Sequence, residues 1–352
     1  MKTYAPVTEA VLDALKTIVG AEYVLTEPEK LEQYQTDEET DPRKFHLPEA
    51  VVLPKDAQEI AAVIKLANTY DVPVTVRSGG TSLAGGAIPV CGGIVLLMER
   101  LNKIIELNAE GMYMEVEAGV RTVDIQKYAN EAGFLYAGDP CSAESCLIGG
   151  NIATNAGGNK AVRYGVTRDQ VYAVEVVTPT GEIVELGARL KKKSTGYCLE
   201  QLIMGSEGTL GIITKATLKL QPIPPYRFDL LAVFSDPEQA LDVVPKIMQA
   251  GINPTSVEYM DNSYVRGTAD YLEFKGAPHY ENGIYVIITV ETFSEDELDL
   301  KMEQLDELCS AAGAVDVLED RMNDIWDMRR NCQECCTSDQ SGFPDGRRGS
   351  SC

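Results

Sequence analysis

The chain has 352 residues, of which 44% are hydrophobic and 24% charged, a balance typical of a globular protein of two or three domains. Its 31 Lys and Arg residues against 54 Asp and Glu residues give a net charge of −23, which argues against nucleic acid and anionic membranes as main partners. The sequence shows no apolar run long enough for a transmembrane segment, no signal-peptide pattern and no disulfide framework among its nine cysteines, so we expect a cytoplasmic protein.

The first part of the chain predicts alternating strands and helices. A strand at 50–54, a helix at 56–70 capped by Asp56 and a strand at 72–77 predict a βαβ unit. The patterns that follow predict strands at 94–98, 103–107 and 112–117, a helix at 122–132, a hairpin at 171–186, a short helix at 198–204 and a long strand after Gly211.

A second pattern begins after a proline-rich linker at 221–226. It predicts an α+β domain with strands at 228–234, 255–260 and 284–291 and helices at 237–250, 261–272 and 295–312. The last residues, 332–352, differ in kind, because they contain no Leu, Ile, Val or Met and hold four of the nine cysteines.

Three segments combine glycine with hydroxyl side chains: 77–86 (RSGGTSLAGG), 149–165 (GGNIATNAGG, then NKAVRYG) and 205–211 (GSEGTLG). Glycine lets backbone N–H groups approach an anion closely, and Ser and Thr add donors. The spacing fits neither a Rossmann G-x-G-x-x-G opening a helix nor a P-loop G-x-x-x-x-G-K-[ST]. Each segment alone is compatible with a simple turn, but three together predict a site for a diphosphate.

In these segments the chain resembles the FAD-binding domain of the vanillyl-alcohol-oxidase (PCMH-type) superfamily. Within it, the chain is most similar to the group that contains the flavin-binding chain of glycolate oxidase and D-lactate dehydrogenase. The resemblance covers about residues 1–330. It implies an α+β fold with a two-subdomain FAD-binding domain at 1–225 (core about 46–225) and a partial ferredoxin-like substrate domain at 226–331, followed by an aberrant tail at 332–352.

The resemblance also implies which residues contact FAD. The diphosphate would be wrapped by Arg77, Ser78, Gly79, Gly80, Thr81 and Ser82. The flavin side would be lined by Pro140, Ser142, Gly149, Gly150 and Asn151. Asn155, Gly157, Gly158, Arg163, Tyr164 and Gly165 would pass along the cofactor, and Glu207, Gly208, Ile212 and Ile213 would hold its ribityl and adenosine parts. Members with covalent flavin have histidine where this chain has Thr81, so we expect noncovalent FAD.

The family oxidises a 2-hydroxy acid, and the substrate carboxylate needs a fork-shaped cation. The run "DIWDMRR" matches the family's Trp-x-x-Arg segment, which makes Arg329 the candidate catalytic residue, with Arg330 as the alternative. A helix-surface arginine paired with Asp327 is the plain structural interpretation. An electron-transfer flavoprotein or an iron–sulfur subunit would take the electrons.

The family's general base and divalent metal ligands are histidines and a glutamate further along. This chain has only His46 and His279, neither in a matching motif. The sequence departs from the family after Asn331, so we expect a truncated or frameshifted end, impaired turnover and an incomplete, loosely packed second domain with exposed apolar sheet faces. A metal or redox site at Cys332, Cys335 and Cys336 is the rival interpretation of the tail.

Three functions remain open at this point. The first is an FAD-dependent 2-hydroxy-acid dehydrogenase of the D-lactate or glycolate type. The second is a flavin-binding module without turnover. The third is a flavin domain from another branch, such as the reductase of cell-wall precursor synthesis or the FAD subunit of molybdenum hydroxylases.

Overall fold

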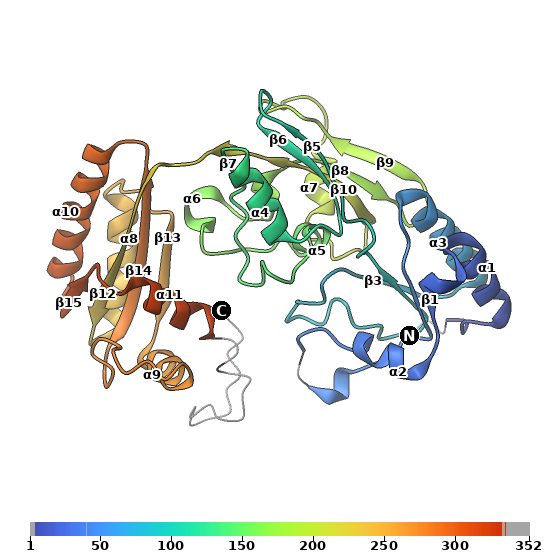
Figure 1. Ribbon diagram of the computed structural model, residues 1–352, viewed down its shortest axis with the longest axis horizontal. Coiled ribbons are helices and arrows are strands. Elements are labelled where there is room, and N and C mark those ends of the chain that lie inside the picture. The colour runs from blue at the N-terminus through green and yellow to red at the C-terminus, as the bar shows by residue number, and fades with distance from the viewer. Residues whose placement is uncertain (1–3, 40, 333–334, 336–352) are drawn as a thin grey trace. The chain divides into compact units, whose positions relative to one another are not determined.

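The computed structural model describes residues 4–39, 41–332 and 335. The chain divides into two compact units. The first comprises residues 1–158 and 165–223, and the second comprises 159–164 and 224–352. Figure 1 labels the elements of both units.

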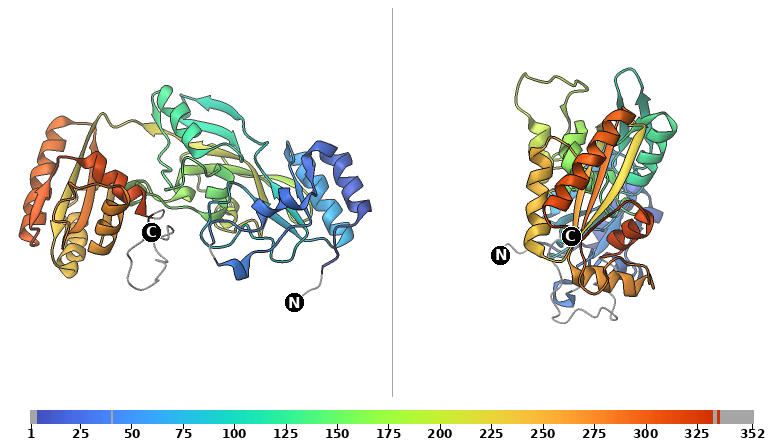
Figure 2. Two further views of the ribbon diagram at one scale, coloured as in Figure 1. Left: turned by 60° about the horizontal axis from the view of Figure 1, so that its bottom comes forward. Right: turned by 90° about the vertical axis from the view of Figure 1, so that its left-hand side faces the viewer.

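The first unit opens with a four-stranded sheet in the order β1-β2-β4-β3. Its strands are β1 (Val24–Leu25), β2 (Ala50–Val52), β3 (Val74–Arg77) and β4 (Ile94–Leu97). Strands β2 and β3 both run parallel to β4, and α3 (Ala57–Tyr70) connects them, so the predicted βαβ unit is confirmed. The Asp56 side chain caps α3 by accepting from the Glu59 N–H, as expected. Helix α1 (Glu9–Val19) packs beside α3 (Figure 2).

A second, antiparallel sheet of the same unit has the order β5-β6-β10-β8-β9. Its strands are β5 (Ile104–Asn108), β6 (Tyr113–Glu117), β8 (Val171–Val177), β9 (Ile183–Gly187) and β10 (Ile212–Lys219). The predicted hairpin is confirmed by the pairing of β8 with β9. The remaining α-helices and strands of the unit are α2 (Pro28–Leu31), α4 (Thr122–Glu131), β7 (Phe134–Leu135), α5 (Ile148–Thr154), α7 (Leu199–Ile203) and β11 (Gln221–Pro222).

One apolar core joins the two sheets of the first unit. It includes Leu15 of α1, Ile60 of α3, Leu96 of β4, Met114 of β6 and Leu218 of β10, all with no more than 1% of their surface exposed. Loops that leave these strands are therefore anchored to one packed body, which is the requirement for a precisely shaped binding site.

The second unit is an antiparallel sheet in the order β13-β14-β12-β15. Its elements are α6 (Ala161–Tyr164), β12 (Tyr226–Phe234), α8 (Pro237–Gln249), β13 (Ser256–Met260), α9 (Asn262–Tyr271), β14 (Ile284–Thr292), α10 (Glu295–Ala311), β15 (Asp316–Leu318) and α11 (Met322–Arg330). This strand order is that of a ferredoxin-like fold, so the predicted α+β class is confirmed.

Helices cover both faces of this sheet (Figure 1). One core cluster lies between the sheet and helices α8 and α10, and another lies between the sheet and helices α9 and α11. Strand β14 is buried over its whole length. The expectation of exposed apolar sheet faces is therefore wrong for the described residues. The apolar side chains on the two faces of β12 and β14 pack against helices on both sides of the sheet.

Within the described ranges, no helix combines the length and apolar content that a membrane crossing requires.

Candidate functional site

Arg77, the last residue of β3, packs against the loop that follows it. Its Nη1 donates to the Thr36 carbonyl oxygen over 2.6 Å, and its guanidinium lies 5.7 Å from the centre of the Tyr34 ring. Burial lowers the pKa of Arg77, and the nearby Asp37 carboxylate opposes that shift. Gly80, with φ +69°, approaches so closely that a Cβ there would lie 2.2 Å from Arg77 Nη2. Arg77 thus supports this loop.

The same loop contacts the segment around the start of α5. A Cβ on Gly79 would lie 2.7 Å from the Ser145 carbonyl oxygen, and a Cβ on Gly150 would lie 3.0 Å from the Ser78 Cβ. The first glycine-rich segment therefore packs against the main chain just before α5 and, through the Ser78 side chain, against Gly150 of the second segment.

Helix α5 is fixed by its contacts with the first unit's core. The Gly149 N–H donates to the Ala118 carbonyl oxygen over 2.8 Å, and Asn151 Nδ2 donates to Thr122 Oγ1 over 2.6 Å. Asn151 is only 5% exposed, so this amide orients the helix from inside the protein.

The turn before α5 lies against the end of the second segment. The Ser142 carbonyl oxygen accepts from the Cys146 N–H over 2.8 Å, and the Pro140 carbonyl oxygen accepts from the Ala143 N–H over 3.0 Å. A Cβ on Gly158 would lie 2.0 Å from the Asp139 carbonyl oxygen, so only glycine fits there.

The third glycine-rich segment contacts both of the others. The Glu207 N–H donates to the Ala153 carbonyl oxygen of α5 over 2.9 Å. Glu207 Oε2 lies 2.7 Å from where a Cβ of Gly86 would be, and a Cβ on Gly208 would lie 3.7 Å from Val76 of β3. Each of the three segments therefore contacts the other two. We call residues 78–82, 149–158 and 205–208 the cradle.

Arg168, which sequence reasoning did not single out, joins the cradle. Its N–H donates to Oδ1 of Asn155 over 2.9 Å, and its Nη2 donates to the Met204 carbonyl oxygen over 3.2 Å. Arg168 Nε and Ser206 Oγ are buried polar atoms without a hydrogen-bond partner. The only sequence signal for Arg168 is a basic residue next to a glycine-rich segment in a strongly acidic chain.

These features fit an anionic, phosphate-bearing cofactor. Among the described residues, the main-chain N–H groups of 78–82 donate to no acceptor, and buried donors without partners are rare unless a ligand or water completes them. Of the other expected diphosphate residues, Ser82 accepts from the Ala84 N–H over 3.2 Å, and Thr81 lies beside it in the loop.

Four of the predicted cofactor residues lie elsewhere. Arg163 and Tyr164 belong to the second unit, where Arg163 donates to the Glu291 carbonyl oxygen and the Tyr164 hydroxyl donates to Glu291 Oε2 over 3.2 Å. Ile212 and Ile213, at the start of β10, have their side chains in the first unit's apolar core. Gly165, with φ +79°, returns the chain to the first unit after the excursion at 159–164.

Arg329 forms a partly buried ion pair within the second unit. Its Nε and Nη2 lie 2.9 and 2.8 Å from Glu258 Oε2, and the two side chains are 13% and 16% exposed. Arg330 pairs instead with Asp327 at an exposed position over 2.9 Å. Glu258 gave no sequence signal, because its contact depends on the packing of α11 against β13.

Neither histidine is bonded to a cradle residue. The His46 N–H donates to the Gln35 carbonyl oxygen, and His279 Nε2 lies 3.3 Å from Asp316 Oδ2 at an exposed position. Among the described residues, no group of three or more His, Cys, Asp or Glu side chains is placed to hold a metal ion. Cys332 and Cys335 are buried, whereas Cys336 lies outside the described residues.

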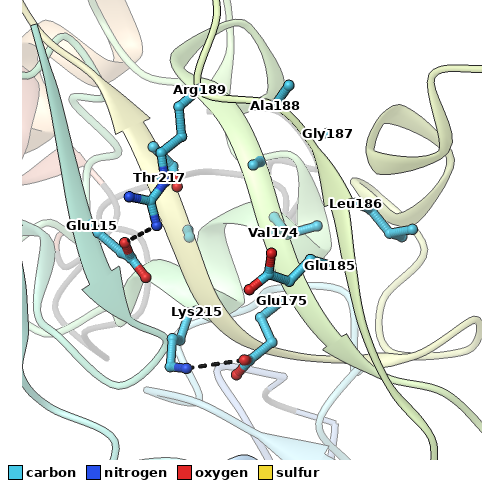
Figure 3. Close-up of a pocket in the computed structure, with 12 residues that line it drawn as sticks. Glu115, Val174, Glu175, Glu185, Leu186, Gly187, Ala188, Arg189, Lys215 and Thr217 are labelled. Atoms are coloured by element: carbon cyan, nitrogen blue, oxygen red, sulfur yellow. Dashed lines mark hydrogen bonds and ion pairs between the residues drawn. The ribbon is translucent and has the colours of Figure 1, made fainter. Parts of the chain in front are cut away.

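Figure 3 shows a pocket on the antiparallel sheet of the first unit, and none of its lining residues belongs to the cradle. It encloses about 230 Å³ and is lined by charged side chains of β6, β8, β9 and β10. Its charges are largely paired: Lys215 lies 2.9 Å from Glu175, and Arg189 pairs with Glu115. We therefore assign the functional site to the cradle, where buried donors lack partners.

Comparison with known proteins identifies the family of both units. Residues 48–187 match a family described as FAD binding domain, and residues 223–344 match one described as FAD linked oxidases, C-terminal domain. The second match continues past Asn331 to residue 344.

Curated relatives have related names. The chain is 38% identical over 322 residues to D-lactate dehydrogenase of Anaerostipes hadrus, covering 90% of this chain and 66% of that protein. It is 37% identical to glycolate oxidase subunit GlcD of Bacillus subtilis, covering 78% and 58% respectively. The chain thus spans about 58 to 66% of the length of these relatives.

Solved structures share the fold. P-cresol methylhydroxylase superimposes with a TM-score of 0.79 at 19% identity, over 93% of this chain and 71% of that one. Alkyldihydroxyacetonephosphate synthase superimposes with a TM-score of 0.77 at 22% identity, over 94% and 64%.

The two-sheet first unit with its cradle and the ferredoxin-like second unit define a flavoprotein of the PCMH type, with FAD as its cofactor. The chain belongs to the FAD-linked oxidase family, in the group of D-lactate dehydrogenases and glycolate oxidases.

Proposed function

We propose that the protein uses FAD to oxidise a small 2-hydroxy acid of the D-lactate or glycolate type. The observation that carries the proposal is the convergence of three glycine-rich segments, of which the first two lie within the residues that match the FAD-binding domain. The names of the relatives supply the substrate class. When bound, the flavin supplies the acceptor for a hydride from the α-carbon of the hydroxy acid.

The cradle would hold the cofactor mainly through main-chain donors. The loop at 78–82 offers main-chain N–H groups that donate to no acceptor among the described residues, and each donor aimed at a charged oxygen contributes about 1.5–3 kcal/mol. Because residue 81 is threonine, no histidyl link to the flavin can form there, and the FAD would be held noncovalently.

Arg329 would bind the substrate carboxylate. A guanidinium presents paired donors that match a carboxylate, and Glu258 already fixes the orientation of this one through Nε and Nη2. We therefore infer that Glu258 positions Arg329 for the substrate carboxylate.

Removal of the proton from the substrate hydroxyl is the step for which this chain offers no general base among the described histidines. A general base must lie within hydrogen-bond reach of that proton, and neither His46 nor His279 is bonded to a cradle residue. We propose that residues 1–352 by themselves turn over slowly, and that electrons leave the reduced flavin for an electron-transfer flavoprotein or an iron–sulfur subunit.

A second candidate is a flavin-binding module without turnover. The pairing of Arg329 with Glu258 favours it, since a carboxylate already occupies the proposed substrate ligand. It shares the cradle with the first candidate and differs only in whether substrate reduces the flavin.

One experiment separates the two. The purified protein is saturated with FAD and mixed anaerobically with D-lactate, L-lactate or glycolate while the visible flavin absorbance is followed. We expect slow bleaching by one of them, and loss of bleaching with unchanged FAD content in Arg329→Gln. Rapid complete bleaching would contradict the missing base, and no bleaching by any hydroxy acid would favour the module.

A further inference from the structure

Two arginines contact cradle residues, and their charged surroundings differ. Arg77 lies in the field of the carboxylates of Asp37, Glu38 and Glu99. Arg168, by contrast, has no carboxylate within 4.0 Å among the residues that the structure describes. A partly buried guanidinium without a counter-ion is destabilising unless an anion compensates for it.

Asp169, next to Arg168 in the chain, and Glu207 of the third segment both direct their carboxylates away from Arg168. The Asp169 carboxylate accepts from the Val166 N–H over 2.9 Å. Glu207 Oε2 lies beside Gly86, in the loop after β3. Neither carboxylate is therefore the missing counter-ion.

Bare main chain brings the Arg168 guanidinium up to the cradle. A Cβ on Gly205 would lie 3.3 Å from Arg168 Nη2 and 3.4 Å from the Asn155 Cβ. The Nη2 bond to the neutral Met204 carbonyl ties the side chain to the third segment, while Nε makes no bond at all. The adjacent Ser206 Oγ is likewise buried without a partner.

We propose that Arg168 supplies the positive charge of the cradle to the diphosphate of FAD, and that Arg77 acts as a support for the loop after β3. Ser206 adds a neutral donor at the same place. This assignment rests on FAD as the cofactor, and it reverses the roles that the sequence predicts for the basic residues of the site.

The test compares ligands that differ in phosphate content. Apoprotein is titrated with FAD, with ADP, which carries the diphosphate without the flavin, and with riboflavin, which carries the flavin without phosphate. Arg168→Gln removes the charge, and because its amide ends near the position of Nε it also removes the Nη2 bond to the Met204 carbonyl. We expect FAD and ADP to bind about 10- to 100-fold more weakly and riboflavin to bind within about twofold of the wild type.

Arg189→Gln is the matched control. Arg189 lines the pocket on the antiparallel sheet of the first unit and pairs with Glu115, so its replacement should change none of the three affinities. If circular dichroism shows that Arg168→Gln does not fold, the test uses Arg168→Lys, which keeps the positive charge. ADP binding within about tenfold of the wild type then supports the proposal. Loss of ADP binding contradicts it. Unchanged FAD affinity in Arg168→Gln, or equal loss of all three ligands, would overturn the assignment. A wild-type apoprotein that binds no FAD would instead overturn the cofactor itself.

Discussion

Gly157 and Gly158 are adjacent, yet the structure gives them different constraints. A Cβ on Gly158 would lie 2.0 Å from the Asp139 carbonyl oxygen and 2.8 Å from the Pro140 nitrogen, both main-chain atoms that cannot swing aside. A Cβ on Gly157 would meet only Val166 at 3.7 Å, an ordinary contact. The sequence shows two equivalent glycines, and only the fold distinguishes them.

Gly158→Ala should therefore separate the turn at 139–140 from the second segment. We expect a loss of about 1–3 kcal/mol in the free energy of unfolding, together with weaker FAD binding, because the clash must be relieved by main-chain movement. Urea denaturation and FAD titration measure the two effects. Gly157→Ala is the control, and equal effects of the two substitutions would refute this account of the cradle.

The raised pKa of Tyr164 predicts that the stability of the second unit depends on pH. Burial, reinforced by the nearby Glu291, raises its pKa to about 12, whereas an unfolded tyrosine titrates near about 10. The folded state therefore holds this proton to higher pH. The stability that the neutral hydroxyl provides is fully present below about pH 10 and is lost as the pH rises towards 12.

In Tyr164→Phe this loss disappears. Between about pH 10 and 12, the free energy of unfolding of the wild type should fall more steeply than that of the variant. Trp326 is the only tryptophan of the chain and lies in the same unit as Tyr164, so its emission can follow urea unfolding at each pH. Parallel pH profiles would show that Tyr164 is not the group responsible.

At the scale of elements, Asp229 ties α11 to the sheet of the second unit. Its Oδ1 accepts from Trp326 Nε1 over 3.1 Å and from the Thr289 hydroxyl, and Arg227 Nη2 lies 3.0 Å away. The carboxylate is thus shared by β12, β14 and α11, and it stabilises the helix that carries Arg329.

Asp229→Ala should leave the Trp326 N–H and the Thr289 hydroxyl without their partner. We expect a cost of about 1–3 kcal/mol and a shift in Trp326 emission in the folded state, since the indole loses its hydrogen bond. Asp327→Ala removes an exposed pair with Arg330 and should cost less than about 1 kcal/mol. Similar costs in the two variants would argue against the role given to Asp229.

Periodicity and glycine placement predict much of the fold from the sequence. The βαβ unit, the β8–β9 hairpin and the alternating strands of the second unit follow from local patterns, and the three glycine-rich segments do meet. The ion pair of Arg329 with Glu258 and the position of Arg168 could not be predicted. Each depends on contacts between elements far apart in sequence, and no periodicity encodes the direction of a single long side chain.

The expectation that failed also has a physical explanation. Exposed sheet faces are expected if the change of composition after Asn331 is interpreted as the end of the family pattern, whereas the family match extends to residue 344. Yet the four strands and covering helices of the second unit lie within the described residues before that point. A domain's core depends on the elements that cover its sheet, and these are present.

At the scale of the whole molecule, the two units have separate apolar cores, and the chain passes between them at 158–159, 164–165 and 223–224. The cradle belongs to the first unit, whereas Trp326 reports on the second. FAD at about 100 times its dissociation constant should stabilise the first unit by about 2.7 kcal/mol.

We therefore expect FAD to raise the unfolding midpoint seen by far-ultraviolet circular dichroism more than the midpoint seen by Trp326 emission. Riboflavin, which lacks the diphosphate, is the control ligand and should shift the first midpoint less. Equal shifts of both signals with FAD would contradict the assignment of the cofactor to the first unit alone.

The central claim is that three stretches of main chain form one site for FAD. Titration of folded apoprotein with FAD, with bound FAD measured by equilibrium dialysis, tests this claim most directly. We predict saturation at one FAD per chain, with binding weakened by Gly158→Ala and little changed by Gly157→Ala. A well-folded apoprotein that retains no FAD at any concentration would contradict the claim.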